Sequence, residues 1–219
     1  MRSVWTSLKS MEISMNTTTD FGKLVHRMNR TYGCFLIWKY IRKSISVPEN
    51  GQEETGRRAG VMDQYGGIFS GILYATENVF ITDLHKFFDK SNSHLTLKTL
   101  IQKLPDSEKK EAEALLGTIT AELKRIENLR HNFTAHEPKS PEEEKIFILE
   151  IEKIFSVVQQ VLNIISKSHG GDFMTWQDWE DSNEASFNCL LDDLELGYRV
   201  RMQNLATVDK PLSVIKPVS

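Results

Sequence analysis

Residues 21–45 read FGKLVHRMNRTYGCFLIWKYIRKSI, and this stretch decides the fold class. Its apolar side chains recur at steps of three and four residues, which is the spacing of one face of an α-helix. They are Leu24, Met28, Tyr32, Phe35, Leu36, Trp38, Ile41 and Ile45. Asp20 precedes the stretch as an N-cap, and Pro48 follows its end. The pattern therefore predicts one long amphipathic helix.

Helical periodicity continues along the rest of the chain. It predicts long helices over about 59–89, 107–136, 140–168 and 182–205, a short helical or turn segment at 95–104, and a loop at 48–59. No stretch alternates with period two for long enough to predict a strand. We therefore expect an all-α fold, a four-helix up-down bundle with a shorter C-terminal helix and tail.

The same patterns predict how the chain is organised. We expect a disordered leader at 1–18, a helical bundle at 19–168, and a C-terminal helix and tail at 169–219 that pack on the bundle. The last long helix of the bundle should open at Ser140, where Pro141 and Glu143 complete the pattern of an N-cap, a first-turn proline and a capping-box glutamate.

Composition limits the classes of function. The 219 residues include 27 Lys and Arg and 30 Asp and Glu, a net charge of −3, so any binding of nucleic acid depends on a local patch. The two cysteines, Cys34 and Cys189, lie far apart and form neither a disulfide framework nor a zinc-binding pair. Residues 1–20 lack the apolar core of a signal peptide, and no apolar run approaches the roughly 20 residues that span a bilayer. We expect a cytoplasmic protein with no membrane partner.

One position breaks the apolar stripe of the helix predicted at 107–136. At about 100° per residue, five apolar side chains share a stripe about 100° wide, and Arg130 takes the next place on it. The five are Leu116, Ile119, Leu123, Ile126 and Phe133. A guanidinium keeps its charge, so its unpaired burial is costly. Arg130 therefore needs an anion, a water-filled cleft or a partner surface, unless it extends its head to solvent from the helix end.

His136 follows Arg130 by six residues. Six residues turn a helix by about 600°, so His136 lies roughly 120° around the helix from Arg130 and about 9 Å along it. One unbroken helix would not bring both side chains to one small group. Either the helix breaks near Pro138, or two copies of the chain pack so that each arginine meets its own histidine and that of the other copy.

Other chemistries find little support in the sequence. Asp83, His85 and Asp89 lie close together on a predicted helix, but two ligands on one face do not make a metal site, and a surface cluster is the simpler interpretation. Paired Glu-x-x-His motifs, a glycine-rich phosphate loop and a serine elbow are missing from the sequence. We therefore expect no metal and no cofactor.

The string LRHNFTAH at 129–136 resembles the signature of the HEPN superfamily, helical-bundle domains whose active members are ribonucleases. That signature is an arginine, usually followed by Asn, Asp or His, with a histidine after a spacer of four to six residues. Here His131 follows Arg130, and five residues separate Arg130 from His136. LYATEN at 73–78 and LTLKTLI at 95–101 are similar to the abortive-infection, AbiU-like branch. The similarity extends over residues 20–168.

The resemblance implies a metal-independent endoribonuclease of the toxin or abortive-infection type. In that family the ribose 2′-hydroxyl attacks the adjacent phosphorus, at a composite site on a dimer interface. Arg130 and His136 are then the catalytic residues, because an arginine suits the phosphate and a histidine suits proton transfer near neutral pH. His131 or Asn132 would orient them, and Thr134 would add a hydroxyl. The implied partners are an RNA substrate, a second copy of the chain and an antitoxin protein.

A function of another class stays open. The chain could be a catalytically inactive HEPN-type bundle that binds RNA, a nucleotide or a partner protein. The intact pair of Arg130 and His136 favours the nuclease, whereas the absence of a strongly basic face favours the binding protein.

Overall fold

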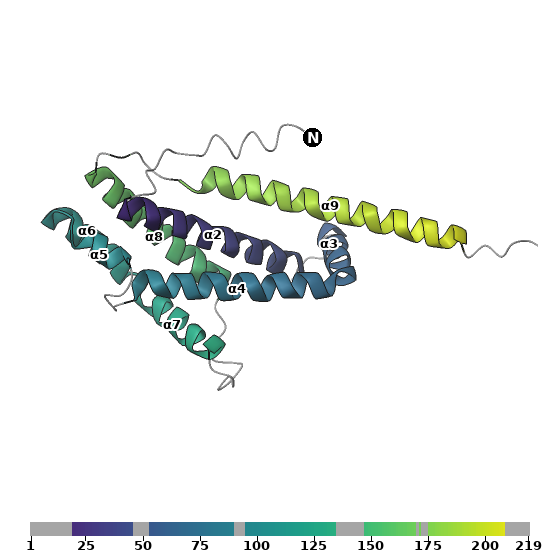
Figure 1. The fold of residues 1–219 in the computed structure, drawn as a ribbon, viewed down its shortest axis with the longest axis horizontal. Helices are drawn as coiled ribbons and strands as arrows, with labels where there is room; N and C mark the ends of the chain where they lie inside the picture. The colour runs from purple at the N-terminus through teal and green to yellow at the C-terminus, as the bar shows by residue number, and fades with distance from the viewer. Residues whose placement is uncertain are drawn as a thin grey trace, which may run out of the picture. The chain divides into compact units, whose positions relative to one another are not determined.

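The computed structural model describes residues 19–45, 53–89, 95–134, 147–169, 171 and 175–208 (Figure 1). This part of the chain holds eight helices and no strand, which confirms the predicted all-α fold. The helices are α2 (Asp20–Ile45), α3 (Glu53–Gln64), α4 (Gly66–Phe88), α5 (Leu97–Ile101), α6 (Asp106–Gly117), α7 (Thr120–Thr134), α8 (Ile148–Ser168) and α9 (Gln177–Val208). None of them is long and apolar enough to cross a membrane. The predicted leader and Ser140 lie outside the described residues. The helix predicted at 140–168 begins only at Ile148, because Phe147 before it is extended and its backbone N–H donates to the carboxylate of Glu150 (3.1 Å).

The helix predicted at 107–136 is two helices. α6 ends at Gly117, and Thr118 and Ile119 form a turn before α7 begins. The hydroxyl of Thr118 donates to the carbonyl of Leu115 (2.7 Å), and that of Thr120 donates to the carbonyl of Gly117 (3.0 Å). Threonine hydroxyls compete in this way for backbone carbonyls, and glycine is a poor helix former, so the break has a local cause.

Two other boundaries differ from the prediction. The helix expected at 59–89 breaks at Tyr65, just before the glycine pair at 66–67, and α3 begins at Glu53, so the loop prediction is wrong for residues 53–59. Pro48 and the Asn-Gly pair at 50–51, the strongest turn signals of that loop, stand before Glu53, whereas Gly56 lies within α3. The C-terminal helix is not shorter, because α9 has 32 residues and α2 has 26. α9 begins at Gln177, before the predicted start at about 182, because residues 177–181 are mostly polar and show no apolar period.

The described chain divides into two compact units. The first comprises Met1–Leu36 and Tyr74–Thr175. Its core joins α2, α4 and α8 through aromatic rings: Phe35 lies 5.9 Å from Phe80 and 5.2 Å from Phe155 between ring centroids. α8 packs against α6 and α7, and Lys153 of α8 pairs with Glu122 of α7 at 2.6 Å. These contacts fix α7, which carries Arg130, within the unit.

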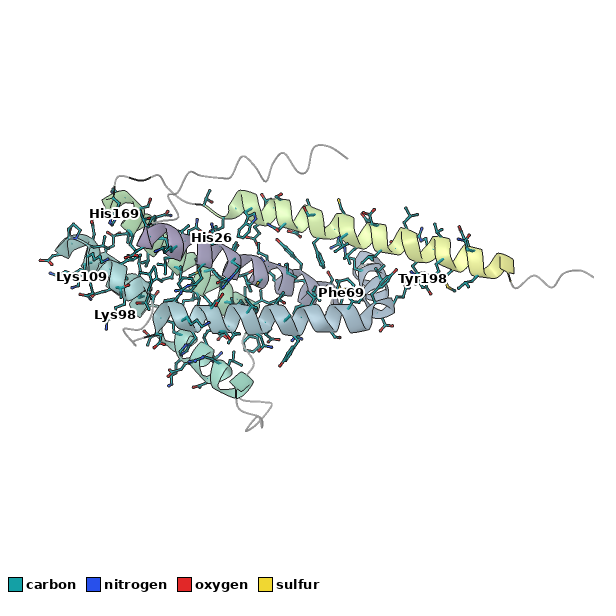
Figure 2. All side chains as sticks on the ribbon, viewed as in Figure 1. His26, Phe69, Lys98, Lys109, His169 and Tyr198 are labelled. Atoms are coloured by element: carbon teal, nitrogen blue, oxygen red, sulfur yellow. The ribbon has the colours of Figure 1, made fainter. Side chains whose placement is uncertain are left out.

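The second unit comprises Ile37–Leu73 and Trp176–Ser219. Its buried apolar cluster draws on the end of α2, α3, the start of α4 and α9 (Figure 2 labels Phe69). The cluster is Ile41, Val61, Met62, Phe69 and Leu191. The hydroxyl of Tyr40 donates to the backbone carbonyl of Glu180 (2.9 Å), and the buried Lys39 pairs with the Glu180 carboxylate. Burial raises the pKa of the Tyr40 phenol.

Candidate functional site

Arg130 stands where the sequence places it, on the apolar side of α7. Ile119, just before α7, is fully buried, and within the helix Ile126 and Leu129 are 1% and 8% exposed. Arg130, one turn after Ile126, is half-buried. Leu116 of the predicted stripe lies on α6, beyond the helix break. The apolar neighbours hold the backbone of Arg130 against the unit, while its side chain carries a charge to the edge of the core.

The side chain of Arg130 contacts the imidazole of His85 on α4. Its Nη1 atom lies 3.2 Å from Nδ1 and 3.3 Å from Nε2. A point in the ring plane at nearly equal distances from both nitrogens would collide with the ring carbon between them. Nη1 therefore lies over the face of the imidazole. A cation over an aromatic face is attracted by the π electrons, and this attraction needs a neutral ring.

A cleft of about 380 Å³ opens between α4 and α7. Its lining combines two aromatic rings, one of them an imidazole, with two aliphatic side chains, a hydroxyl and charged groups of both signs. The lining residues are His85, Phe88, Asp89, Thr120, Leu123, Lys124, Ile126 and Glu127. Lys124 and Glu127 form an ion pair at 3.0 Å. His85 both lines this cleft and contacts Arg130, so the arginine stands at the cleft's edge.

The other predicted site residues are only partly described. His131, Asn132 and Thr134 belong to the last turn of α7, but their side chains lie outside the described residues, as does the whole of His136. That Arg130 and His136 lie close together therefore stays a prediction. His85 was not foreseen as a neighbour of Arg130, since 45 residues separate the two. Only the packing of α4 on α7 brings them together.

The acidic cluster considered as a metal site has another role. Asp83 is buried, pairs with Arg30 at 2.5 Å, and lies 3.7 Å from Lys86. The hydrogen bond and the charge of Asp83 raise the pKa of Arg30. Across the described ranges, no three His, Cys, Asp or Glu side chains are grouped so that they could hold a metal ion.

Comparison with known proteins identifies the family. The model of the HEPN family AbiU2 matches residues 36–188. This match covers more than half of the chain, so the chain belongs to the AbiU2 family of HEPN proteins. No curated protein and no solved structure matches it.

Proposed function

We propose that this AbiU2-family chain is a metal-independent endoribonuclease of the toxin or abortive-infection type. The observation that supports this most is the contact of Arg130 with the imidazole face of His85 at the edge of a cleft. The contact with the imidazole ring holds the guanidinium in position. A positioned guanidinium suits the phosphate of RNA, because its planar fork binds phosphate oxygens bidentately.

In the proposed reaction, the 2′-oxygen of the ribose bonds to the adjacent phosphorus and the bond from phosphorus to the 5′-oxygen breaks. His136 takes the proton of the 2′-hydroxyl, and the departing 5′-oxygen takes up a proton. Arg130 stabilises the added negative charge on the pentacovalent phosphorus. His131 or Asn132 orients the two groups, and Thr134 supplies a hydroxyl. The products end in a 2′,3′-cyclic phosphate and a 5′-hydroxyl.

The proposed active form is a homodimer. Arg130 and His136 stand roughly 120° apart around a continued helix, so a second copy of the chain would complete each site. Light scattering at micromolar concentration should show a dimer, and a monomer alone would count against a composite site. An antitoxin protein that blocks this interface, and a cytoplasmic location, belong to the same proposal.

A binding protein without nuclease activity is the second candidate. The observation that favours it is the presence of two carboxylates, Asp89 and Glu127, in the cleft next to Arg130. Carboxylates repel an RNA backbone, and the chain as a whole has a net charge of −3. Such a cleft would suit a nucleotide base or a basic segment of a partner protein.

Incubation of the purified chain with total RNA separates the two candidates. We expect cleavage that persists in excess EDTA, products with cyclic phosphate ends, and no reaction when the scissile position carries deoxyribose. His136→Ala should slow cleavage by about 10²–10⁴-fold. His26→Ala is the matched control, because His26 is an exposed histidine of α2 (labelled in Figure 2).

Three results would contradict the nuclease. They are cleavage of the deoxy substrate, activity that disappears with EDTA and returns with magnesium, and RNA binding without any cleavage by the unmodified chain. The last result would establish the binding protein in its place.

A further inference from the structure

We propose that His85 is a positioning residue for Arg130, and that it acts through the face of its imidazole ring. This inference rests on the proposed nuclease function, but the contact itself can be tested without it. It adds to the Arg–His signature a group from a different helix, 45 residues away from Arg130 in the sequence.

The geometry excludes an ordinary hydrogen bond to a ring nitrogen. The lone pair of a neutral imidazole lies in the ring plane and points away from the ring at one nitrogen only. Nη1 of Arg130 is nearly equidistant from both nitrogens, at 3.2 and 3.3 Å, and so lies over the ring. An N–H of Nη1 therefore points at the face of the ring and not at the lone pair of one nitrogen. The same guanidinium can then direct N–H groups in its plane toward a phosphate.

The ring is held on a rigid element. His85 is half-buried, and its neighbours on α4 are among the most buried residues of the unit: Leu84 and Phe87 are both 0% exposed. Phe80 of the same helix belongs to the aromatic core. Arg130, in contrast, occupies the last turn of α7. A ring fixed by the core therefore supports a long, flexible side chain near a helix end, which reduces the number of conformations that a substrate must select.

Charged groups of both signs lie around His85. Asp89 follows it by one turn of α4, and Lys124 and Glu127 line the same cleft from α7. Arg130 adds a positive charge directly over the ring. An imidazolium in this position would repel the guanidinium, so the contact serves the site only while the ring is uncharged.

Replacement of His85 by three residues separates the possible roles. His85→Phe keeps an aromatic face and removes both nitrogens, His85→Asn keeps a hydrogen-bonding group and removes the face, and His85→Ala removes both. We expect His85→Phe to cleave RNA within about threefold of the unmodified chain. His85→Asn and His85→Ala should lose roughly 10²-fold in kcat with little change in KM, because a misplaced guanidinium acts mainly on the transition state. Because the ring of His85→Phe cannot gain a proton, this variant should keep its activity to lower pH than the unmodified chain, while the proton transfer by His136 remains.

A spectroscopic measurement tests the contact without activity. Protons of the Arg130 side chain that lie over a ring are shielded by its ring current, so their NMR signals should shift upfield. The shift should persist in His85→Phe and disappear in His85→Ala. Thermal unfolding of each variant shows whether the fold survives, and His26→Ala is again the control for loss of a histidine.

Each outcome decides the inference. Loss of activity in His85→Phe equal to that in His85→Ala would overturn it and make His85 a proton-transfer or hydrogen-bonding group. Full activity in His85→Asn or His85→Ala would also overturn it. Absence of the upfield shift in the unmodified chain would refute the contact, whatever the activity. A shift that is present in a chain that cleaves no RNA would refute the proposed nuclease function, and with it the positioning role, while the contact would stand.

Discussion

Arg30 and Arg130 both contact the last turns of α4, but they meet opposite kinds of group. Arg30 of α2 pairs with the buried carboxylate of Asp83, whereas Arg130 of α7 lies over the imidazole of His85. A carboxylate opposes the charge of a guanidinium, whereas an imidazole carries no negative charge. The comparison separates an arginine with a buried acidic partner from one that contacts a ring at the edge of a cleft.

Arg27 shows that a ring face by itself does not make a functional arginine. Its guanidinium lies 4.3 Å from the ring centroid of Phe87 and donates to the backbone carbonyl of Leu95 (2.8 Å). Burial lowers the pKa of this arginine. Arg27 links α2 to the segment before α5, so its contacts are structural. What distinguishes Arg130 is the cleft that its ring partner lines.

The largest expected effect tests the role proposed for Arg130. Arg130→Leu should lower RNA cleavage by about 10²–10³-fold, because it removes the charge that stabilises the transition state. It should leave the free energy of unfolding unchanged or raise it, since leucine completes the apolar stripe of α7. Denaturant unfolding and cleavage assays measure the two quantities. Arg125→Leu is the comparison variant, because it removes an arginine of the same helix that pairs with Glu150 of α8, so it should lower the stability and leave cleavage unchanged.

A loss of several kcal/mol in Arg130→Leu would contradict this assignment. It would make Arg130 a structural ion-pair partner like Arg30, and the two arginines would then have the same role.

The same comparison predicts the opposite result for Arg30, namely a loss of stability without a loss of cleavage. Arg30→Leu leaves the buried carboxylate of Asp83 without its 2.5 Å partner, with Lys86 more distant at 3.7 Å. The free energy of unfolding should fall by about 1–3 kcal/mol, the cost of a poorly satisfied buried acceptor. Cleavage per folded molecule should not change. Lys23→Leu, at an exposed position of the same helix, is the matched control for the loss of a surface cation. Equal stability of the two variants would show that Asp83 does not depend on Arg30.

The smallest expected effect concerns the thiol of Cys34, which lies near the pair of Arg30 and Asp83. Burial raises the pKa of Cys34, and the positive charge of Arg30 partly opposes this shift. A raised pKa lowers the thiolate fraction at any pH below it, so Cys34 should react with an alkylating reagent more slowly than the exposed Cys189 near the ordinary thiol pKa of about 8.5. Its rate should rise as the pH increases further. Mass spectrometry of labelled peptides measures both sites, and equal rates would mean that Cys34 is more accessible than its burial indicates.

The sequence predicts those parts of the molecule whose causes are local. The α2 helix ends at Ile45, as its apolar period predicts. It begins one residue before the predicted start, because the hydroxyl of Thr19, and not the side chain of Asp20, accepts the capping hydrogen bond from the backbone N–H of Gly22 (3.0 Å). The half-buried place of Arg130 on the apolar side of α7 follows from the same periodicity. The break between α6 and α7 was missed, since the apolar positions on both sides of Gly117 still fit one helical stripe.

The rest of the candidate site depends on packing that periodicity does not encode. The contact of His85 with Arg130 requires that α4 and α7 lie together, and nothing in the residues around His85 indicates its distant partner. The sequence grouped His85 with Asp83 because they are close along the chain. In the folded chain Asp83 pairs with Arg30, whereas His85 contacts Arg130. The roles of His131, Asn132, Thr134 and His136 stay predictions.

The separation of Asp83 and His85 by two residues has a consequence for how this helix can change over evolution. Two residues turn an α-helix by about 200°, so the side chains leave α4 in nearly opposite directions. Point substitutions can alter either arginine's partner independently. A single inserted or deleted residue earlier in α4 would instead rotate both partners by about 100° and remove both at once. Residues 83 and 85 can therefore change one at a time between descendants of this chain, while the number of residues between them and the core anchor Phe80 should stay constant.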